Sequence, residues 1–224
     1  MAAALARSTG SSIRQKREVK KQGGVMAIIY LVRHGRTDLL GKMLCGNTPG
    51  IHLNEEGCGQ AQKAAEHLSS FPIKAIYSSP IERALETAQI IGKKSRLEIN
   101  PVDFLREIHF GDLQGMGEKE LVDHSLWKRF NSQPADVYFP NGESVTEVQA
   151  RVARGLEFLS HQYDNDNQIV CVAHSEVLRL AVCWVLDLPL DSLHRLTIDP
   201  ASISIIEITP ERKKLRLLNF QPTK

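Results

Sequence analysis

Two uninterrupted apolar segments, each followed at once by a polar site residue, constrain the fold of this chain most. Residues 28–32 precede Arg33 and His34, and residues 169–173 precede His174. Apolar runs of this length are typical of strands buried on both faces, as in the parallel sheets of α/β proteins. Open sheets of that kind bind ligands beyond the carboxyl ends of their strands. The two segments therefore predict a central sheet with polar groups gathered at one edge.

Segments with helical patterns alternate with the predicted strands along the chain. Further strands are expected over residues 74–77 and 202–208, and residues 215–220 are expected to pair with the latter as a hairpin. The helices are expected over residues 54–68, 79–91, 118–130, 144–161 and 176–186. This alternation predicts an α/β fold with a mostly parallel sheet. A length of 224 residues is ordinary for a single α/β domain.

A strong helix-start signal follows the predicted strand at residues 74–77. Ser79 is expected to be the N-cap, Pro80 the first helical residue, and Glu82 the partner in a capping box. Arg83 would then be the fourth helical residue, in the first turn and beside the end of a strand. N-caps of two other helices are expected at Asn54 and Ser144.

The first 25 residues differ in composition from the rest of the chain. They are rich in Ala, Ser, Arg and Lys and carry a net charge of +5, which leaves −3 for residues 26–224 because the whole chain carries +2. We predict a basic tail over residues 1–25 and a globular domain over residues 26–224. The tail is interpreted as disordered or as a mis-assigned start, with Met26 as the real first residue. A transit peptide is the alternative interpretation.

Composition limits the partners of the globular part. Its mild negative charge argues against nucleic-acid binding, and no apolar stretch approaches the roughly 20 residues needed to span a bilayer. The four cysteines show no spacing typical of zinc, and no cluster of carboxylates suggests magnesium, so neither a metal nor a cofactor is expected. We expect a cytoplasmic protein, because a chain of this length needs no disulfide framework.

The strand ends and the helix start bring two arginines and two histidines toward one place. Arg33 and His34 follow the first strand, Arg83 begins a helix, and His174 follows a later strand. A guanidinium group binds phosphate oxygens through two parallel hydrogen bonds, and an imidazole can attack phosphorus. Taken alone, Arg83 could also be a surface arginine of a helix, and His174 could be a core histidine with its hydrogen bonds made inside the protein. Their joint placement predicts a phosphate site.

Four motifs carry a resemblance to a known family. They are Arg33-His34-Gly35 after a strand, Ser78-Ser79-Pro80 followed by Arg83 and Thr87-Ala88, Glu107 followed by Phe110-Gly111, and His174 after a strand. In this order the motifs resemble the histidine phosphatase superfamily, in its phosphoglycerate mutase-like branch, over residues 28–208. The resemblance implies a three-layer α/β sandwich, with a mostly parallel central sheet flanked by helices.

The resemblance also implies a role for each of these residues. His34 would be the nucleophile that becomes phosphohistidine, and Glu107 would protonate the leaving oxygen and then activate water. Arg33, Arg83 and His174 would hold the phosphoryl oxygens. The implied activity is metal-independent hydrolysis of a small-molecule phosphate ester, with guanidinium and imidazolium groups supplying the positive charge.

Two positions depart from the family pattern. The family often has Asn six residues after the nucleophile, where this chain has Leu40, so that one phosphate donor is missing. After the second histidine the family usually has Gly, where this chain has Ser175 and then Glu176. Ser175 still offers a backbone N–H, and we expect it to bind phosphate together with Thr37.

Two other functions stay open. A cofactor-dependent phosphoglycerate mutase is the first, although the short distance in sequence from Glu107 to the turn at residues 142–144 leaves little chain for a closed lid. A non-catalytic phospho-ligand-binding module is the second, and the intact set of site residues argues against it. Aromatic residues of the 111–140 segment suggest either a pocket wall or core packing: Trp127, Phe130, Tyr138 and Phe139. A homodimer through the last strand is a further hypothesis.

Overall fold

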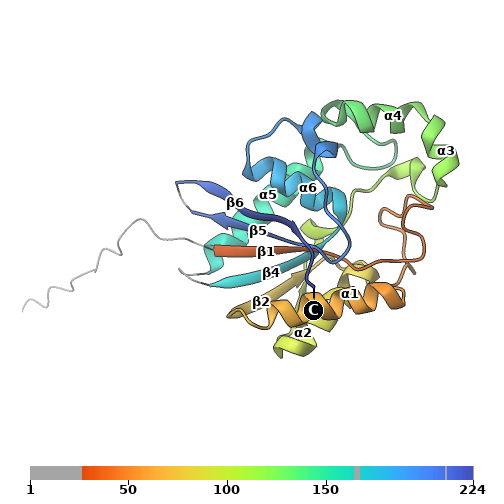
Figure 1. The fold of residues 1–224 in the computed structure, drawn as a ribbon. Helices are drawn as coiled ribbons and strands as arrows, with labels where there is room; N and C mark the ends of the chain where they lie inside the picture. The colour runs from red at the N-terminus through yellow and green to blue at the C-terminus, as the bar shows by residue number, and fades with distance from the viewer. Residues whose placement is uncertain (1–26, 164–166, 210, 224) are drawn as a thin grey trace, which may run out of the picture.

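The computed structural model describes residues 27–163, 167–209 and 211–223. In this part of the chain, six strands form one sheet in the order β3-β2-β4-β1-β5-β6 (Figure 1). The strands are β1 (Ala27–Arg33), β2 (Ile73–Ser78), β3 (Ile99–Pro101), β4 (Gln168–Ala173), β5 (Ile203–Ile208) and β6 (Lys213–Phe220). The basic tail predicted over residues 1–25 lies outside the described residues, so the domain boundary at residue 26 stays a prediction.

Strand β1 lies inside the sheet, and its two neighbours run in opposite directions. β4 pairs parallel to both β1 and β2, and β3 pairs parallel to β2. β5 is antiparallel to β1, and β6 is antiparallel to β5. The predicted mostly parallel sheet and the C-terminal hairpin are therefore confirmed. Because Arg33 pairs with Ala173, the next residues, His34 and His174, leave the sheet side by side.

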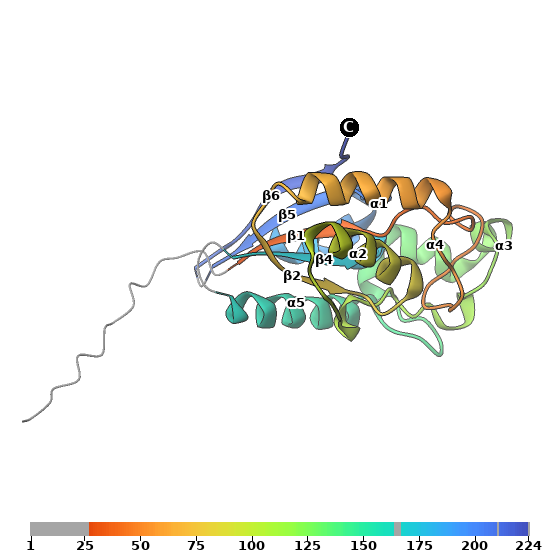
Figure 2. The same cartoon turned by 90° about the horizontal axis from the view of Figure 1, so that it is seen from below.

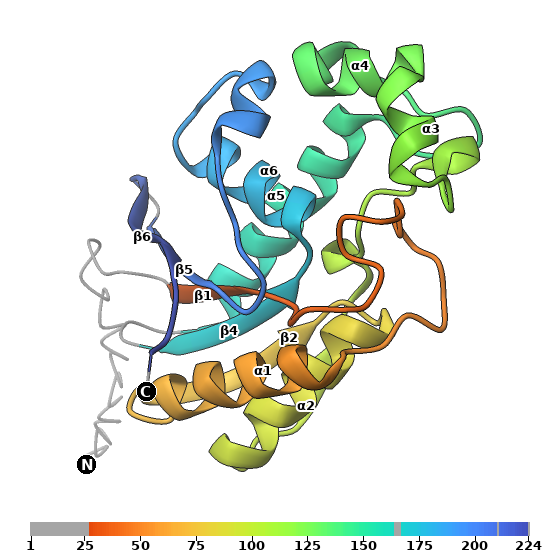
Figure 3. The same cartoon turned by 45° about the vertical axis from the view of Figure 1, so that its right-hand side comes forward.

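Helices cover both faces of the sheet and complete a three-layer sandwich (Figures 2 and 3). The helices are α1 (Glu55–Leu68), α2 (Glu82–Ser95), α3 (Glu118–Asp123), α4 (Ser125–Ser132), α5 (Val145–Gln162) and α6 (Ser175–Val185). Short 3-10 helices are η1 (Asp103–Leu105), η2 (Gly111–Leu113), η3 (Pro134–Asp136) and η4 (Leu190–Arg195). Figure 3 shows α1 and α2 below the sheet and α5 and α6 above it. No helix in the described ranges is long and apolar enough to cross a membrane.

The side chains of β1 divide the core into two clusters. Tyr30 and Val32 pack with residues of α1 and α2, whereas Ile29 and Leu31 pack with residues of α5 and α6. Successive side chains of a strand point to opposite faces of the sheet, so a strand with an apolar residue at every position can fill two cores. This packing is the physical reason why residues 28–32 contain no charged side chain, and the hydroxyl group of Tyr30 is paired with Gln168.

A lobe of irregular chain lies beyond the carboxyl ends of the parallel strands. The helix predicted over residues 118–130 is in fact two helices, α3 and α4, because His124 between them adopts an extended backbone (φ −71°, ψ 125°). Figures 1 and 3 show both helices on the same side of the sheet as the loop that follows β1. A bridge between Met43 and Gly117 joins that loop to the lobe. The lobe and the loop thus lie together beyond the carboxyl ends of the parallel strands.

The helix-start predictions are confirmed at two positions and wrong at one. The side chain of Asn54 accepts a hydrogen bond from Gly57 N, and Ser144 forms the expected capping box with Glu147. At Ser79 the prediction fails, because α2 begins at Glu82 with Ile81 as its N-cap. Arg83 is therefore the second helical residue. The hydroxyl group of Ser79 instead contacts a histidine of the site described below.

Candidate active site

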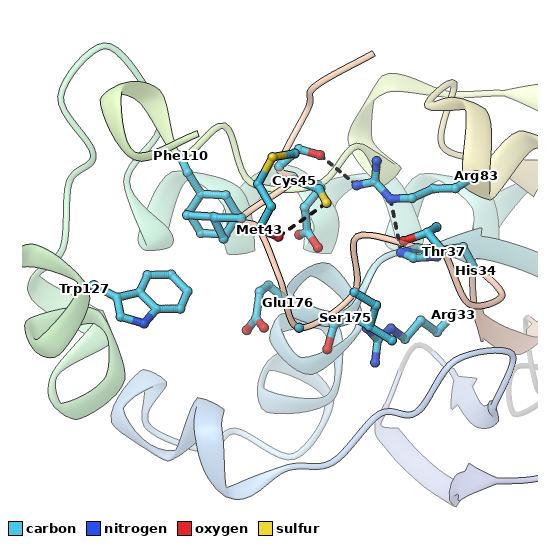
Figure 4. Close-up of a pocket in the computed structure, with 15 residues that line it drawn as sticks. Arg33, His34, Thr37, Met43, Cys45, Arg83, Phe110, Trp127, Ser175 and Glu176 are labelled. Carbon is cyan, nitrogen blue, oxygen red and sulfur yellow. Dashed lines mark hydrogen bonds between the residues drawn. The ribbon is translucent and has the colours of Figure 1, made fainter. Parts of the chain in front are cut away.

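The four predicted arginines and histidines meet at the carboxyl edge of the sheet. Arg33 and His34 come from β1, His174 follows β4, and Arg83 lies in the first turn of α2. The ring centroids of His34 and His174 are 5.2 Å apart. Figure 4 shows Arg33, His34 and Arg83 at one end of a cavity and Trp127 at the other. The cavity holds about 140 Å³, which suits a small ligand.

The hydrogen bonds of His34 leave a lone pair on the nitrogen that faces Arg83. His34 Nδ1 lies 2.7 Å from the carbonyl oxygen of Gly35, an acceptor, so Nδ1 carries the proton. Arg83 Nε donates to His34 Nε2 over 3.2 Å, which requires a free pair there. The pKa of His34 is well below its usual value, first because the ring is buried and then because Arg83 and Arg33 are positively charged. His34 is therefore neutral, with Nε2 ready to act as a nucleophile.

Arg83 is held by the loop that follows β1. It is buried, and its Nη2 donates to the carbonyl oxygen of Gly46 over 2.7 Å. Arg33 Nη1 donates to the carbonyl oxygen of Ile198 over 2.6 Å. Each guanidinium group thus has one nitrogen fixed by the backbone of a distant segment. Fixed donors of this kind need no reorganisation when a charged ligand binds.

Ser79 determines which nitrogen of His174 carries a proton. Its Oγ lies 2.8 Å from His174 Nε2 and accepts from Ile81 N over 3.3 Å, and both side chains are fully buried. Because the serine has one proton and no other acceptor for it among the described residues, that proton goes to His174 Nε2. His174 Nδ1 then carries the ring proton and is a donor. Sequence reasoning missed this contact, because a serine before Pro80 is equally compatible with capping a helix and with pairing to a buried histidine.

Three buried nitrogens of the site have no hydrogen-bond partner among the described residues. They are Arg33 Nε, Arg83 Nη1 and His174 Nδ1. Buried donors are almost always paired in native proteins, so three of them around one point call for an explanation. A tetrahedral anion beside His34 Nε2, with several oxygens to share among the donors, would pair with them. The site therefore has the chemistry of a phosphate site.

Glu107 supplies a carboxyl group close to these cations. Its side chain is buried, and Oε1 accepts from the backbone N–H of Ile108 over 2.9 Å. Burial, and secondarily the carboxylate of Glu176, raise the pKa of Glu107 to about 7. A carboxyl group with this pKa can give and take a proton near neutral pH.

Arg151, on α5, fixes the backbone that carries Glu107. Its Nη2 donates to the carbonyl oxygen of Glu107 over 3.1 Å, and Nη1 donates to that of Phe104 over 2.8 Å. The same guanidinium group pairs with Glu143, whose Oε2 also accepts from His109 N. A Cβ atom at Gly142 would lie 2.2 Å from the carbonyl oxygen of His109, so only glycine fits there. Arg151 and the turn at residues 142–144 thus hold the backbone of Glu107 in place. Sequence reasoning missed this role of Arg151, because no local sequence pattern indicates it.

The remaining predicted site residues lie in the same cavity. Thr37 and Ser175 line it, as does Leu40, which stands where the family often has Asn and offers no donor. Glu176 also lines the cavity, a placement that sequence reasoning did not predict, although its position two residues after His174 was a signal. In the described part of the chain, no group of three or more His, Cys, Asp or Glu side chains is placed to hold a metal ion.

The aromatic residues of the lobe divide between the cavity and the core. Trp127 lines the cavity together with Phe110. Phe130 and Phe139 are fully buried in the core of the lobe, and Tyr138 is 58% exposed. Of the two interpretations left open, the cavity wall therefore holds for Trp127, and core packing holds for Phe130 and Phe139, whose edge-to-face contacts with Phe110 lie in the core. Tyr138 fits neither interpretation.

Comparisons with known proteins agree with this site. The family model of the histidine phosphatase superfamily (branch 1) matches residues 29–221. Phosphoglycerate mutase-like protein 4 of Arabidopsis thaliana is 37% identical over 68% of this chain and 68% of its own length. Phosphoserine phosphatase 1 of Hydrogenobacter thermophilus is 31% identical over 87% of this chain and 93% of its own. The solved α-ribazole phosphatase of Shigella flexneri has a TM-score of 0.77 at 25% identity, over 88% of this chain and 98% of that one.

The chain therefore belongs to the histidine phosphatase superfamily. Within that superfamily it is a phosphatase, in line with relatives named as phosphatases that match most of its length. The expected enzyme class and the three-layer α/β fold are both confirmed.

Proposed function

We propose that the chain hydrolyses phosphate monoesters of small metabolites in two steps, with His34 as the nucleophile. The proposal is carried by one observation: the lone pair of His34 Nε2, which accepts from Arg83 Nε, lies in a site where Arg33, Arg83 and His174 each keep one buried nitrogen without a partner among the described residues. Such donors stabilise the charge that builds on phosphoryl oxygens in the transition state. The catalytic domain that we propose covers residues 26–224.

In the first step, His34 Nε2 attacks phosphorus while the bond to the leaving oxygen breaks. The electron pair of the broken bond stays on the alcohol oxygen, and Glu107 protonates that oxygen. The products are the free alcohol, a phosphohistidine and an ionised Glu107. Burial of Glu107 supports this role, because a carboxyl group with a pKa near 7 is still partly protonated at neutral pH.

In the second step, water displaces His34 from phosphorus. The ionised carboxylate of Glu107 takes a proton from water, whose oxygen attacks phosphorus as the bond to Nε2 breaks. Phosphate leaves, His34 is again neutral, and Glu107 is again protonated. Dividing hydrolysis into two displacements makes each barrier lower than that of a single direct attack.

Trapping of the intermediate tests the proposal. Wild-type protein mixed with a ³²P-labelled ester and quenched in alkali should retain label that is stable to base and labile to acid. His34→Ala should lose the label and about 10⁴-fold or more of kcat on p-nitrophenyl phosphate. His161→Ala, an exposed histidine, is the matched control and should behave as the wild type. Normal turnover in His34→Ala would remove the covalent mechanism.

The same preparation decides between the hydrolase and its two alternatives. With 3-phosphoglycerate and 2,3-bisphosphoglycerate, a hydrolase should release inorganic phosphate and form little 2-phosphoglycerate. Rapid isomerisation without phosphate release would identify a mutase. Tight phosphate binding without turnover of any ester would identify a binding module.

A further inference from the structure

We infer that Glu176 selects the substrate by accepting a hydrogen bond from a donor on its alcohol part, either an ammonium group or a hydroxyl group. This inference rests on the proposed function and concerns the other end of the same cavity. It assigns a substrate class: phosphate esters whose alcohol carries an N–H or O–H donor a few bonds from the ester oxygen.

The position of Glu176 places it beside the alcohol part of a bound ester. It is the second residue of α6, two positions after His174, and it lines the cavity together with His34 and Trp127. In Figure 4 its carboxylate lies between Ser175 and Trp127, on the side of the cavity away from Arg33. A phosphoryl group held beside His34 would direct its ester oxygen and the attached alcohol toward this end.

One oxygen of the Glu176 carboxylate has a partner and the other has none. Oε1 accepts from Arg179 Nη1 over 2.9 Å. Oε2 is buried and has no hydrogen-bond partner among the described residues. A buried carboxylate oxygen without a donor is destabilising, and such groups in native structures call for an explanation. A donor on the substrate would satisfy Oε2 without disturbing the pair with Arg179.

The other residues at this end of the cavity cannot replace Glu176 in this role. Apolar side chains form most of the wall there: Leu40, Met43, Leu44, Phe110 and Trp127. The thiol of Cys45 donates to the carbonyl oxygen of Met43 over 3.4 Å. Glu107, the second carboxyl group lining the cavity, is assigned to proton transfer. Within the described lining, Glu176 is therefore the acceptor left for the alcohol part.

Charge at this end also disfavours some substrates. Glu176 lies on the alcohol side, and its negative charge helps to raise the pKa of Glu107. An alcohol that carries only a carboxylate would meet this charge without a matching cation. Specificity built from such repulsion is as effective as specificity built from attraction. Phosphoglycolate, whose alcohol part carries a carboxylate and no hydroxyl group, should therefore be a poor substrate.

A panel of five small esters tests the inference. Ethyl phosphate is the reference without a donor, phosphoethanolamine offers N–H donors, and glycerol 1-phosphate offers O–H donors. Phosphocholine has the positive charge without a donor, and phosphoglycolate has a carboxylate without a donor. We expect kcat/KM on phosphoethanolamine, on glycerol 1-phosphate or on both to exceed that on ethyl phosphate by about 10-fold or more, since hydrogen bonds to charged groups contribute about 1.5–3 kcal/mol. The better of the two donor esters identifies the donor.

The variant Glu176→Gln keeps an oxygen for Arg179 and removes the charge. We expect it to reduce the ratio of kcat/KM between the preferred donor ester and ethyl phosphate by about 10-fold. If the substitution also changes the pKa of Glu107, that change affects the turnover of both esters and cancels in the ratio. Glu98→Gln, an exposed glutamate outside the cavity, is the matched control and should preserve the ratio.

Three results would overturn the inference. They are a ratio that Glu176→Gln leaves unchanged, phosphocholine turned over as well as the preferred donor ester, and phosphoglycolate turned over faster than both donor esters. Failure of the wild type on all five esters and on p-nitrophenyl phosphate would instead overturn the proposed function. Circular dichroism of each variant confirms that the fold is retained.

Discussion

The two ends of the cavity are built in different ways. At the phosphate end, His34 and His174 follow strands and Arg83 lies in the first turn of α2. All three are buried and bond to backbone, to one another or to Ser79. At the alcohol end, the walls come mostly from the loop after β1 and from the lobe of α3 and α4, and most of the lining is apolar. The contrast teaches that the ends of strands and helices position the residues of the phosphate end, whereas loops and the lobe supply most of the surface that surrounds the alcohol.

The two ends also shift pKa values in opposite directions. Burial and two guanidinium groups lower the pKa of His34, whereas burial and a neighbouring carboxylate raise the pKa of Glu107. A neutral nucleophile and a protonated acid can therefore exist together near neutral pH. Titratable groups whose environments separate their pKa values in this way identify the base or nucleophile and the acid of a site.

The largest effect at the alcohol end is expected from Glu107→Gln. The variant cannot protonate the leaving oxygen, so kcat on an alkyl phosphate should fall by about 10²–10⁴-fold, and on p-nitrophenyl phosphate by much less. In the wild type, kcat on the alkyl ester should decrease as pH rises above about 7, because Glu107 then loses its proton. Steady-state kinetics from pH 5 to pH 9 measure both effects. An equal loss on the two esters would contradict the assignment of Glu107 as the acid.

At the phosphate end, Arg83→Lys should reduce kcat/KM by about 10²–10³-fold on every ester. A single ammonium group cannot bond to His34, to Gly46 and to phosphate at once, although the charge is retained. The matched control is Arg36→Lys, since Arg36 is exposed and pairs with Glu56 outside the cavity. If the loss depended on the alcohol, the division between the two ends would be wrong.

Ser79→Ala should have a smaller effect at the phosphate end, with kcat reduced about 10-fold. Without the serine proton, His174 can adopt either tautomer, and only the one protonated at Nδ1 donates to phosphate. ¹⁵N NMR of the imidazole groups should show a mixture of tautomers for His174 in the variant and one tautomer in the wild type. Ser79→Thr should restore the single tautomer, and Ser70→Ala, an exposed serine, serves as the control. A single unchanged tautomer in Ser79→Ala would refute this role.

The smallest expected effect is on stability, and it follows from the raised pKa of Glu107. The pKa of this carboxyl group is about 7 in the folded chain and 4.5 as its ordinary value. Its contribution to stability is therefore complete below pH 4.5 and is lost as pH rises through about 7. Glu107→Gln should be more stable than the wild type at pH 8, by on the order of 1–3 kcal/mol, and should show no such gain at pH 4. Urea unfolding at the two pH values measures the difference, and a gain of equal size at both would exclude this cause.

Much of the phosphate end could be predicted from the sequence. Apolar runs at residues 28–32 and 169–173 predict buried strands, and the residues that follow such strands must lie at one edge of a parallel sheet. Arg83 was placed correctly beside a strand end, although its helix begins later than expected. These predictions succeed because strand pattern and strand direction are local or nearly local properties.

Less of the alcohol end could be predicted. The sequence left open whether the aromatic residues of the lobe form a cavity wall or pack in the core, and the structure places Trp127 at the wall and Phe130 and Phe139 in the core. Arg151 and Glu143, which hold the Glu107 backbone, carry no local signal of that role. Loops meet through side chains that lie far apart in sequence, and no periodic pattern records which of them come together.

The amino-acid sequence by itself determined the strands, the mostly parallel sheet and the edge at which the phosphate-binding residues gather, because hydrophobic periodicity and chain direction fix these features. Only the tertiary structure decided that the hydroxyl group of Ser79 forms a hydrogen bond with His174 instead of capping a helix. It also decided that Glu176 lines the cavity with one carboxylate oxygen unpaired among the described residues. The reason is physical: a hydroxyl or carboxylate group has several partners open to it, and packing between distant elements selects one.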